Sequence, residues 1–496
     1  MSELSLLLLA YPLGALLVWL VPRSDQARGA ALFAHLVGLT LALAVLARFD
    51  PAQAGFQMLA RSSWIPGLHI DYAVGVDGLS VLFLPATALL FLGVALVSWN
   101  SAQGRADAGA PRLPRLYHSL LLLQAGATLG IFSAVDTLMF FLFWELSLVP
   151  FYFLVGLWGA GPHRDYAATK YTLVMLAGGV PLLFGFLLLA FNHAEYSGAG
   201  LSFDLATLLN TPLPDHLETI VFLLLLLGFA VKTPVFPLHT WLPLMAMEGP
   251  APVVALLTGL KLGAYGLIRF AVPLAPGAAH ELQWLLVGLG VVGMLFGAVA
   301  ALAQTNLRAM LAYSSLSHVG LVLLGIAAFN LQGLQGAVLQ LVNFTLISGG
   351  LFLLAALVQQ RLGSTDLLAL GGAAKRMPLL ASLFLFLGLA SLGLPGTSGF
   401  PAELLMLLGL FQAHAGAALA ALFAMVVGAG YFLNLYRRAF QGPVTHPALD
   451  RASDLGRRER LLLLLFAGLV LLFGLYPAPL LDLIQPAAQA WLARVG

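Results

Sequence analysis

The chain has 496 residues, of which 60% are hydrophobic and 9% are charged. Soluble domains carry about 25% charged residues, so this composition excludes a soluble enzyme and predicts an all-α polytopic membrane protein. The chain has no cysteine, which excludes disulfides, cysteine-ligated iron–sulfur clusters and cysteine zinc sites. Its net charge of +2 carries little information for a chain that lies mostly in lipid. We expect the bilayer as a partner and no nucleic acid.

Apolar stretches long enough to cross a bilayer recur along the whole chain. At about 20 residues per span, the length accommodates about fourteen helices. The first stretch lacks a basic segment and a cleavage site, so we expect a retained helix rather than a signal peptide. The longest loops expected are 49–76, 192–217 and 439–460, and none is large enough for a catalytic domain. The predicted spans are 3–21, 30–48, 77–98, 117–133, 136–157, 169–191, 219–243, 251–272, 283–304, 309–329, 332–358, 378–413, 416–436 and 461–479.

The basic residues are distributed unequally between the two sides of these spans. With the N-terminus outside, 17 lysines and arginines face the cytoplasm, 3 face outside and 3 lie within spans. An excess of basic residues in cytoplasmic loops is the usual signal of orientation. The asymmetry predicts that the N-terminus lies outside, and it supports the number of spans.

Two lysines and two glutamates lie well inside apolar predicted spans, namely Lys232, Lys261, Glu145 and Glu403. A charge at the bilayer centre costs roughly 2.5–3.5 kcal/mol on insertion scales, so such residues indicate a functional site. Two of the chain's four lysines are in this group. Lysine loses its proton readily on burial and arginine does not, which favours a role in proton transfer.

Proline interrupts two of the spans. The seventh reads AVKTPVFPLHTWLP and the twelfth reads GLASLGLPGTSGFPAELLML, with a polar residue at the same offset in Pro237-x-His239 and Pro401-x-Glu403. Proline frees backbone carbonyls, and a break at membrane depth is tolerated only against protein or a water-filled cavity. The broken spans are five helices apart and therefore antiparallel. This spacing predicts inverted repeats with ion sites at the broken helices.

The repeats comprise spans 4–8 and 9–13. We therefore expect four segments: an N-terminal three-helix segment, two repeats, and a C-terminal helix with a tail. Their predicted bounds are 1–116, 117–275, 276–440 and 441–496.

These residues together predict a path for protons. Burial drives a glutamate and a lysine toward their neutral forms whereas pairing favours both charges, so Glu145–Lys232 is a candidate switch and Lys261 a candidate carrier. His239 and His318 titrate near neutral pH and can relay protons, and Glu403 would be the last titratable group. The alternatives are a permanent Glu145–Lys232 ion pair, a snorkelling Lys261, a helix-capping His239, and a hydrogen bond between helices at His318.

Other polar residues receive smaller roles. Asn343, Tyr265 and Ser317 are relay candidates, with helix packing as the alternative role. We expect Arg269 to snorkel from the outer end of its span. No role is expected for four histidines in loops or at interfaces, which are His118, His163, His280 and His446.

At these positions the chain resembles a known family. FFLFWELSLVPFYFLVGLWG, FAVKTPVFPLHTWLP, LKLGAYGLIRFAVPL, LRAMLAYSSLSHVGLVLLG and GLPGTSGFPAELL are similar to the antiporter-like subunit M family of NADH–quinone oxidoreductase, or complex I. WIPGLHIDYAVGVDGLSVLF near the start favours subunit M over its larger relative, subunit L. The similarity covers nearly the whole chain, and the order of the motifs is specific.

The resemblance implies a fold of fourteen helices with discontinuous helices seven and twelve. It implies a non-redox, proton-translocating subunit in a bacterial inner membrane, with flavin mononucleotide, iron–sulfur clusters and quinone in other subunits. Antiporter-like subunits L and N are the implied neighbours. It also assigns the pair to Glu145 and Lys232, the central lysine to Lys261 and the exit to Glu403, with His239 and His318 on histidine positions of the family.

Two departures from the family pattern remove titratable residues from the central part of the predicted relay. Leu244-Met245-Ala246 replaces an Asp-Ala-His-like stretch, and Asn343 stands where His or Lys is common. They leave the route from Lys261 to Glu403 open. They also leave open a multi-subunit cation/proton antiporter, a membrane-bound hydrogenase or an inorganic-carbon uptake complex as the parent assembly. A non-conducting scaffold is disfavoured, because four membrane charges are costly without a use.

Overall fold

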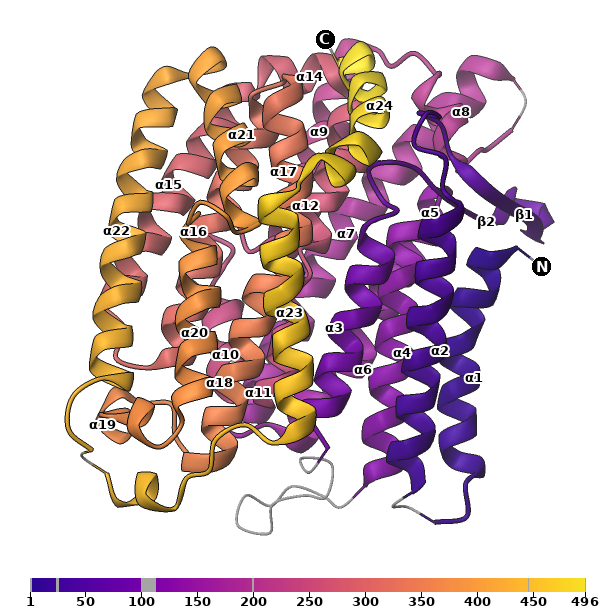
Figure 1. The fold of residues 1–496 in the computed structure, drawn as a ribbon. Helices are drawn as coiled ribbons and strands as arrows, with labels where there is room; N and C mark the ends of the chain where they lie inside the picture. The colour runs from indigo at the N-terminus through magenta and orange to yellow at the C-terminus, as the bar shows by residue number, and fades with distance from the viewer. Residues whose placement is uncertain (1, 24–25, 100–112, 199, 445, 496) are drawn as a thin grey trace.

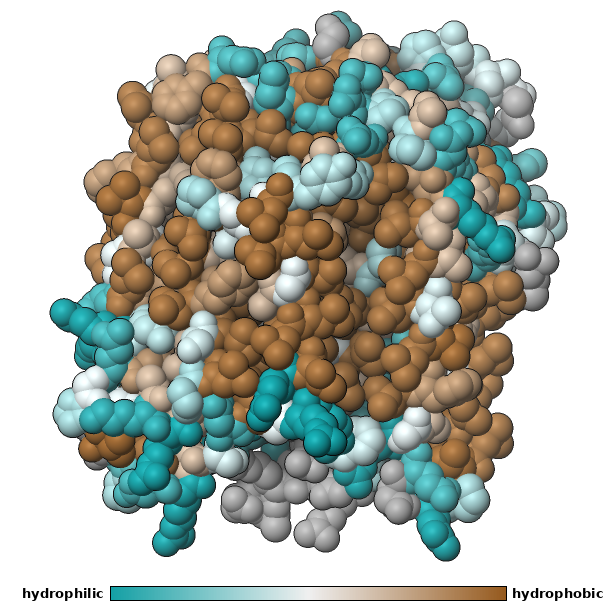
Figure 2. All heavy atoms as spheres, in the orientation of Figure 1, coloured by the Kyte–Doolittle hydropathy of each residue, from teal (hydrophilic) through white to brown (hydrophobic). Residues whose placement is uncertain are grey.

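The computed structural model describes residues 2–23, 26–99, 113–198, 200–444 and 446–495. Its helices run between two ends, with the β-hairpin and the C-terminus at one end and α19 (Leu367–Leu370) at the other (Figure 1). A broad hydrophobic band covers the middle of the face in Figure 2, and hydrophilic residues gather at both ends. This pattern is that of a protein with a lipid-facing belt. Two arginines counted toward the orientation, Arg105 and Arg112, lie outside the described residues.

The N-terminal segment is a bundle joined to a hairpin. Its helices α1 to α4 pack on one another, and β1 pairs with β2 in antiparallel register. The hairpin lies within 49–76, which the sequence presented as a loop. Positive φ angles occur at the connecting residue His69 and at Met58 inside β1, and the long apolar runs around the hairpin dominate the sequence pattern. The elements are α1 (Glu3–Leu20), α2 (Gln26–Arg48), β1 (Gln57–Ile65), β2 (Ile70–Val76), α3 (Phe83–Val97) and α4 (Pro114–Ser133).

The next segment contains the first proline break. Helix α9 ends at Lys232 and α10 begins at Trp241, so the predicted interruption of span seven is confirmed. A second interruption follows without proline, between α11 and α12 at Lys261, and a π-helical turn continues the span. The helices are α5 (Thr137–Leu146), α6 (Leu148–Trp158), α7 (Arg164–Ser197), α8 (Leu205–Leu209), α9 (Asp215–Lys232), α10 (Trp241–Glu248), α11 (Ala251–Gly259), α12 (Leu262–Gly266) and α13 (Val272–Leu274).

The remaining segment contains the second proline break, between α20 and α21. A π-helical turn over Phe344–Ser348 separates α17 from α18. The last two helices bend by 69° at a short break, and α24 packs along α17. The helices are α14 (Pro276–Glu281), α15 (Gln283–Leu302), α16 (Leu307–Ala327), α17 (Leu331–Asn343), α18 (Gly349–Leu362), α20 (Pro378–Ser391), α21 (Gly399–Ala413), α22 (Ala415–Phe440), α23 (Arg457–Leu475) and α24 (Ala478–Val495).

The polytopic all-α prediction is confirmed. Among the described residues, 10 helices are long and apolar enough to cross a membrane, or up to 12 if each bent pair is one span. The predicted fourteen also include α3, which has 15 residues, and α9, which carries Asp215, Glu218 and Lys232 within its 18. Helix α3 is too short to be counted as a span by its length, and α9 carries too many charged residues to be counted by its composition.

Candidate functional site

Lys232 ends the half-helix α9 at the first proline break. Its ammonium donates to the backbone oxygen of Trp144 at 3.1 Å and to Oγ of Ser147 at 2.8 Å, and it lies 4.0 Å from the centre of the Trp144 ring. The C-terminal end of a helix carries partial negative charge, which favours a cation there. The break thus holds a half-buried lysine through dipoles and an aromatic face.

Glu145 lies on α5, one residue from the Trp144 carbonyl that binds Lys232. The two side chains interact electrostatically, but they form no ion pair, since none of the ion pairs among the described residues includes either group. Oε1 of Glu145 is buried without a hydrogen-bond partner. Its carboxyl group lines an apolar groove of about 550 Å³ with Leu142, Val149 and Thr172. The predicted partners are therefore neighbours in an unpaired arrangement.

Lys261 occupies the second interruption of the chain, between α11 and α12. The side chain is 3% exposed, which excludes the snorkelling alternative. Its ammonium lies 3.4 Å from the backbone oxygen of Leu257 and 5.1 Å from the centre of the Phe344 ring. Thr345 donates to the carbonyl of Gly259, at 3.1 Å, which the interruption leaves free. A lysine that is buried without a carboxylate can exist there only with dipolar stabilisation or as the neutral amine.

His318 and Glu403 meet at the second proline break. The carboxyl Oε1 of Glu403 lies 3.7 Å from Nε2 of His318, and Glu403 is 3% exposed. The histidine ring faces two carbonyls, with Nδ1 2.8 Å from Ser314 and Nε2 2.7 Å from Ser391. A neutral imidazole has one N–H, so both contacts are hydrogen bonds only in the doubly protonated form. The two carbonyl contacts therefore suit a cationic histidine.

The groups of the two breaks are linked through Lys261. The Lys261 ammonium interacts electrostatically with His318, and α12 packs so closely on α9 that a β-carbon on Gly263 would overlap Thr233, the neighbour of Lys232. A small cavity of about 20 Å³ adjoins His318 and Glu403. This volume is sufficient for one water molecule. The structure thus brings the predicted residues together as two groups with Lys261 between them.

The remaining candidates take positions of different kinds. His239 lies in the first break, stacked on Phe236 with ring centres 5.5 Å apart, and its Nδ1 is buried without a partner. Asn343 donates to the carbonyl of Ser398 at 2.7 Å inside the second break. Ser317 donates to the carbonyl of Met294 at 2.9 Å, and Tyr265 donates to the carbonyl of Phe132 at 3.2 Å. Ser317 and Tyr265 thus form contacts between helices.

Arg269 differs from its expected position. It is buried, and its guanidinium forms a bidentate ion pair with Asp77 at 2.5 and 2.6 Å, while Nε donates to Tyr265 at 3.2 Å. The expectation of snorkelling was therefore wrong, because Asp77 from the segment before α3 reaches the same depth. Asp77 begins a predicted span, and a carboxylate at a span boundary carries no functional signal, so the sequence did not predict this pair.

His118 also differs from its expected position in a loop or at an interface. It is 1% exposed inside α4, and both ring nitrogens lack a partner among the described residues. His35 on α2 is buried in the same way, and the two rings interact electrostatically. The predicted span began one residue earlier, at 117, so helix α4 starting at Pro114 carries His118 a full turn inside.

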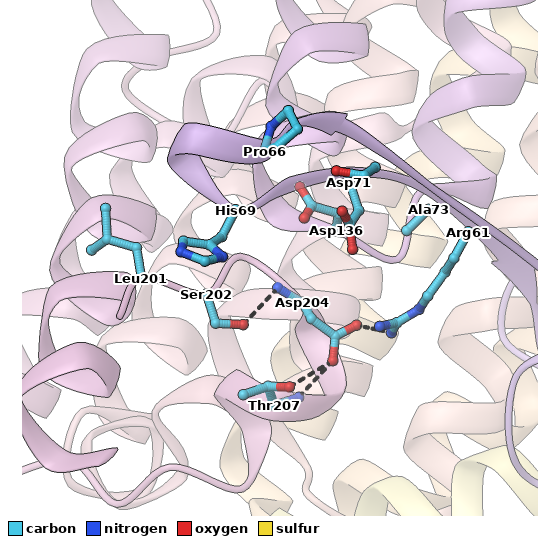
Figure 3. A pocket seen from close by; sticks show the side chains of 11 residues that line it. Arg61, Pro66, His69, Asp71, Ala73, Asp136, Leu201, Ser202, Asp204 and Thr207 are labelled. Carbon is cyan, nitrogen blue, oxygen red and sulfur yellow. Dashed lines mark hydrogen bonds and ion pairs between the residues drawn. The ribbon is translucent and has the colours of Figure 1, made fainter. Parts of the chain in front are cut away.

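A polar cavity of about 470 Å³ lies under the hairpin, outside the membrane-spanning helices. Figure 3 shows Asp71, Asp136 and Asp204 around it, with Arg61 paired to Asp204. Asp136 caps α5 by accepting from the amides of Leu138 and Met139 at 2.9 and 2.8 Å. Burial, with smaller contributions from the other two carboxylates, raises the pKa of Asp136 to about 6.

Comparison with known proteins identifies the family. Residues 134–428 match the family described as NADH:quinone oxidoreductase/Mrp antiporter, TM. NADH-quinone oxidoreductase subunit M of Rhodobacter capsulatus is 36% identical over 94% of this chain and 90% of its own. The protein of that name from Pseudomonas aeruginosa is 37% identical over 97% and 96%. This chain belongs to the subunit M family.

Two solved structures share the fold of this chain. A chain of respiratory complex I from Thermus thermophilus superposes with a TM-score of 0.89 at 32% identity, over 99% of this chain and 100% of that one. A chain of the Mrp complex from Dietzia gives a TM-score of 0.83 at 24% identity, over 98% of this chain and 52% of that one, and shows the shared fold alone. Within the described residues of this family member, no cluster of three or more His, Asp or Glu side chains could hold a metal ion.

Proposed function

We propose that this chain is a proton-translocating, non-redox membrane subunit of a complex I-type NADH–quinone oxidoreductase. The observation that carries the proposal is the set of ionisable groups at the interrupted helices, with Lys232 and Glu145 at one break, His318 and Glu403 at the other, and Lys261 between them. Relatives named NADH-quinone oxidoreductase subunit M match over 90% and 96% of their own length, which supports the proposal.

Proton transfer in this proposal begins near the first break. A proton from the cytoplasm binds Lys232 or Lys261, and changes in the Glu145–Lys232 contact set which of the two holds it. His318 then passes the proton toward Glu403, which releases it outward. Asn343 carries no titratable group, so any transfer past it requires an ordered water. His239, Tyr265 and Ser317 complete the proposed relay.

The energy for this movement comes from other subunits. Flavin mononucleotide, iron–sulfur clusters and quinone belong there in the proposal, and the neighbours in the membrane are the antiporter-like subunits L and N. The N-terminus lies outside a bacterial inner membrane, in agreement with the excess of basic residues on one side. The proposed repeats span 117–275 and 276–440.

The parent assembly can be tested by purification of the tagged chain from native membranes. The proposal predicts flavin and iron–sulfur absorbance in the particle, together with NADH:quinone activity coupled to proton movement. A particle without flavin that contains other antiporter subunits would overturn the assignment in favour of a cation/proton antiporter. A particle with hydrogenase or carbon-uptake activity would overturn it in favour of those assemblies.

A further inference from the structure

The Glu145 carboxyl group rests on a glycine of the neighbouring helix. A β-carbon built on Gly179 of α7 would overlap Oε1 of Glu145. Oε1 is the oxygen that is buried without a hydrogen-bond partner. The unpaired arrangement of Glu145 therefore exists because residue 179 has no side chain.

The adjacent glycine has a different role. A β-carbon on Gly178 would lie 2.8 Å from Cβ of Val231 on α9, and one on Gly228 would lie 2.9 Å from the Gly178 carbonyl. Gly178 and Gly228 thus let α7 and α9 cross closely, as small residues do in membrane helix pairs. Gly179 points toward α5 instead, so its missing side chain serves Glu145 rather than the crossing.

The second proline break repeats the arrangement. Oε2 of Glu403 is also buried without a hydrogen-bond partner, and a β-carbon on Gly393 would overlap it. Gly393 lies at φ +68°, so the backbone there favours glycine for a second reason. Both membrane glutamates hence place one oxygen against a glycine, although the two glycines lie on different elements and in different backbone conformations.

We propose that Gly179 is a positioning residue that gives Glu145 a place to lie when it is not paired with Lys232. The proposal rests on the proposed function. The place offers no donor to Oε1, so it suits the protonated acid, whereas the ionised carboxylate gains by approaching the Lys232 ammonium. The titratable groups that interact with Glu145 are Lys232 and Tyr171. Glycine at 179 thereby keeps both arrangements accessible.

The test replaces Gly179 in the assembled complex. Gly179→Ala fills the space against which Oε1 of Glu145 lies. Because the overlap forces side chains off their preferred rotamers, we expect the ratio of paired to unpaired Glu145 to rise by about tenfold. We expect proton pumping per NADH oxidised to fall several-fold. We also expect a weaker infrared band of the protonated Glu145 carboxyl, which is the band that Glu145→Gln abolishes.

Two controls separate this effect from helix packing. A β-carbon from Gly185→Ala on the same helix meets the flexible side chain of Leu225, with Cδ2 at 2.8 Å and Cγ at 3.2 Å, and no group of the proposed proton path, so this variant should change neither measurement. Glu145→Asp shortens the side chain by one methylene and withdraws it from residue 179. In that background Gly179→Ala should have no further effect on pumping or on assembly.

Each outcome supports or overturns the role of Gly179. Wild-type pumping and an unchanged carboxyl band in Gly179→Ala would overturn the inference, and so would a failure of assembly that persists in the Glu145→Asp background. If Glu145→Gln itself pumps normally, the proposed function fails first. If Glu145→Gln stops pumping while Gly179→Ala does not, only the role of Gly179 is overturned.

Discussion

Three cations within the membrane region, Arg269, Lys232 and Lys261, are held in two different ways. Arg269 has a carboxylate partner, Asp77, on both of its terminal nitrogens and a hydroxyl on the third. Lys232 and Lys261 instead have carbonyls, a serine hydroxyl and aromatic faces, and no carboxylate within ion-pair distance. Arginine is thus used where a charge is permanent, and lysine where its neighbours allow the charge to leave.

These three charges therefore differ in the groups that surround them, and those groups indicate whether the charge is fixed or can be lost. Removal of a fixed partner should damage the folded state, whereas removal of a mobile charge should damage transport in a folded complex. His318 stands between the two classes, since its contacts with Ser314, Ser391 and Glu403 depend on its protonation.

The largest expected effect comes from breaking the fixed pair. Asp77→Ala leaves the Arg269 guanidinium buried without a carboxylate, which costs about 3–5 kcal/mol. We expect little assembled complex, as measured by the amount of this chain in purified particles. The double variant Asp77→Leu with Arg269→Met removes both charges and should recover much of the assembly. Equal loss in both variants would contradict a structural ion pair.

The second effect separates charge from proton release at the central lysine. Lys261→Arg keeps a cation between the two breaks but cannot give up its proton. We expect normal assembly and NADH oxidation with proton pumping reduced by about tenfold or more, the scale of a lost general acid–base group. The measurement is proton uptake in reconstituted vesicles. Pumping at the wild-type level would place Lys261 with Arg269, as a fixed charge.

A smaller effect is expected at Asn343, which is polar but carries no charge. Asn343→Leu leaves the Ser398 carbonyl of the second break without its donor, at a cost of about 1–3 kcal/mol. We expect a lower midpoint of thermal unfolding with the proton-to-NADH ratio unchanged in the complexes that remain. A selective loss of pumping without a change in stability would show that an asparagine-bound water belongs to the path.

The smallest effect on proton transport concerns Asp136, which lies outside the membrane-spanning helices and acts on stability alone. Its folded pKa of about 6 exceeds the ordinary 3.8, so the folded chain binds this proton more tightly than the unfolded chain. The free energy of unfolding from this group therefore decreases as pH rises from 3.8 to about 6. Asp136→Asn keeps an oxygen for the cap of α5 and should remove that decrease, as unfolding measured across pH would show. An unchanged pH profile would contradict the pKa.

Much of the fold was predictable because lipid imposes a simple pattern. The bilayer demands continuous apolar helices, so spans and both proline breaks followed from composition and from residues such as Pro234 and Pro401. The interruption at Lys261 was not predictable, because no proline marks it and because the residue that stabilises it, Thr345, is far away in the sequence. The hairpin within 49–76 was not predicted for the same reason, since contacts with distant parts of the chain stabilise its strands.

The site was predictable in its residues but not in their contacts. Any ionisable group in an apolar run draws attention, so Glu145 and Lys232 were found, whereas their unpaired arrangement depends on Gly179, which carries no chemical signal. His118 was placed wrongly and Asp77 was not predicted, because a residue near a span boundary moves from surface to interior with a shift of one helical turn. Sequence patterns locate charges along the chain, and partners require the packed structure.

The most direct test measures protons translocated per NADH oxidised by complexes that contain Lys232→Ala. The exposed lysine Lys375, replaced in the same way, is the matched control. We predict that Lys232→Ala complexes assemble and oxidise NADH but translocate markedly fewer protons, while Lys375→Ala complexes behave as wild type. An unchanged proton ratio in assembled Lys232→Ala complexes would contradict the central claim that the lysines with no carboxylate in ion-pair contact carry the proton.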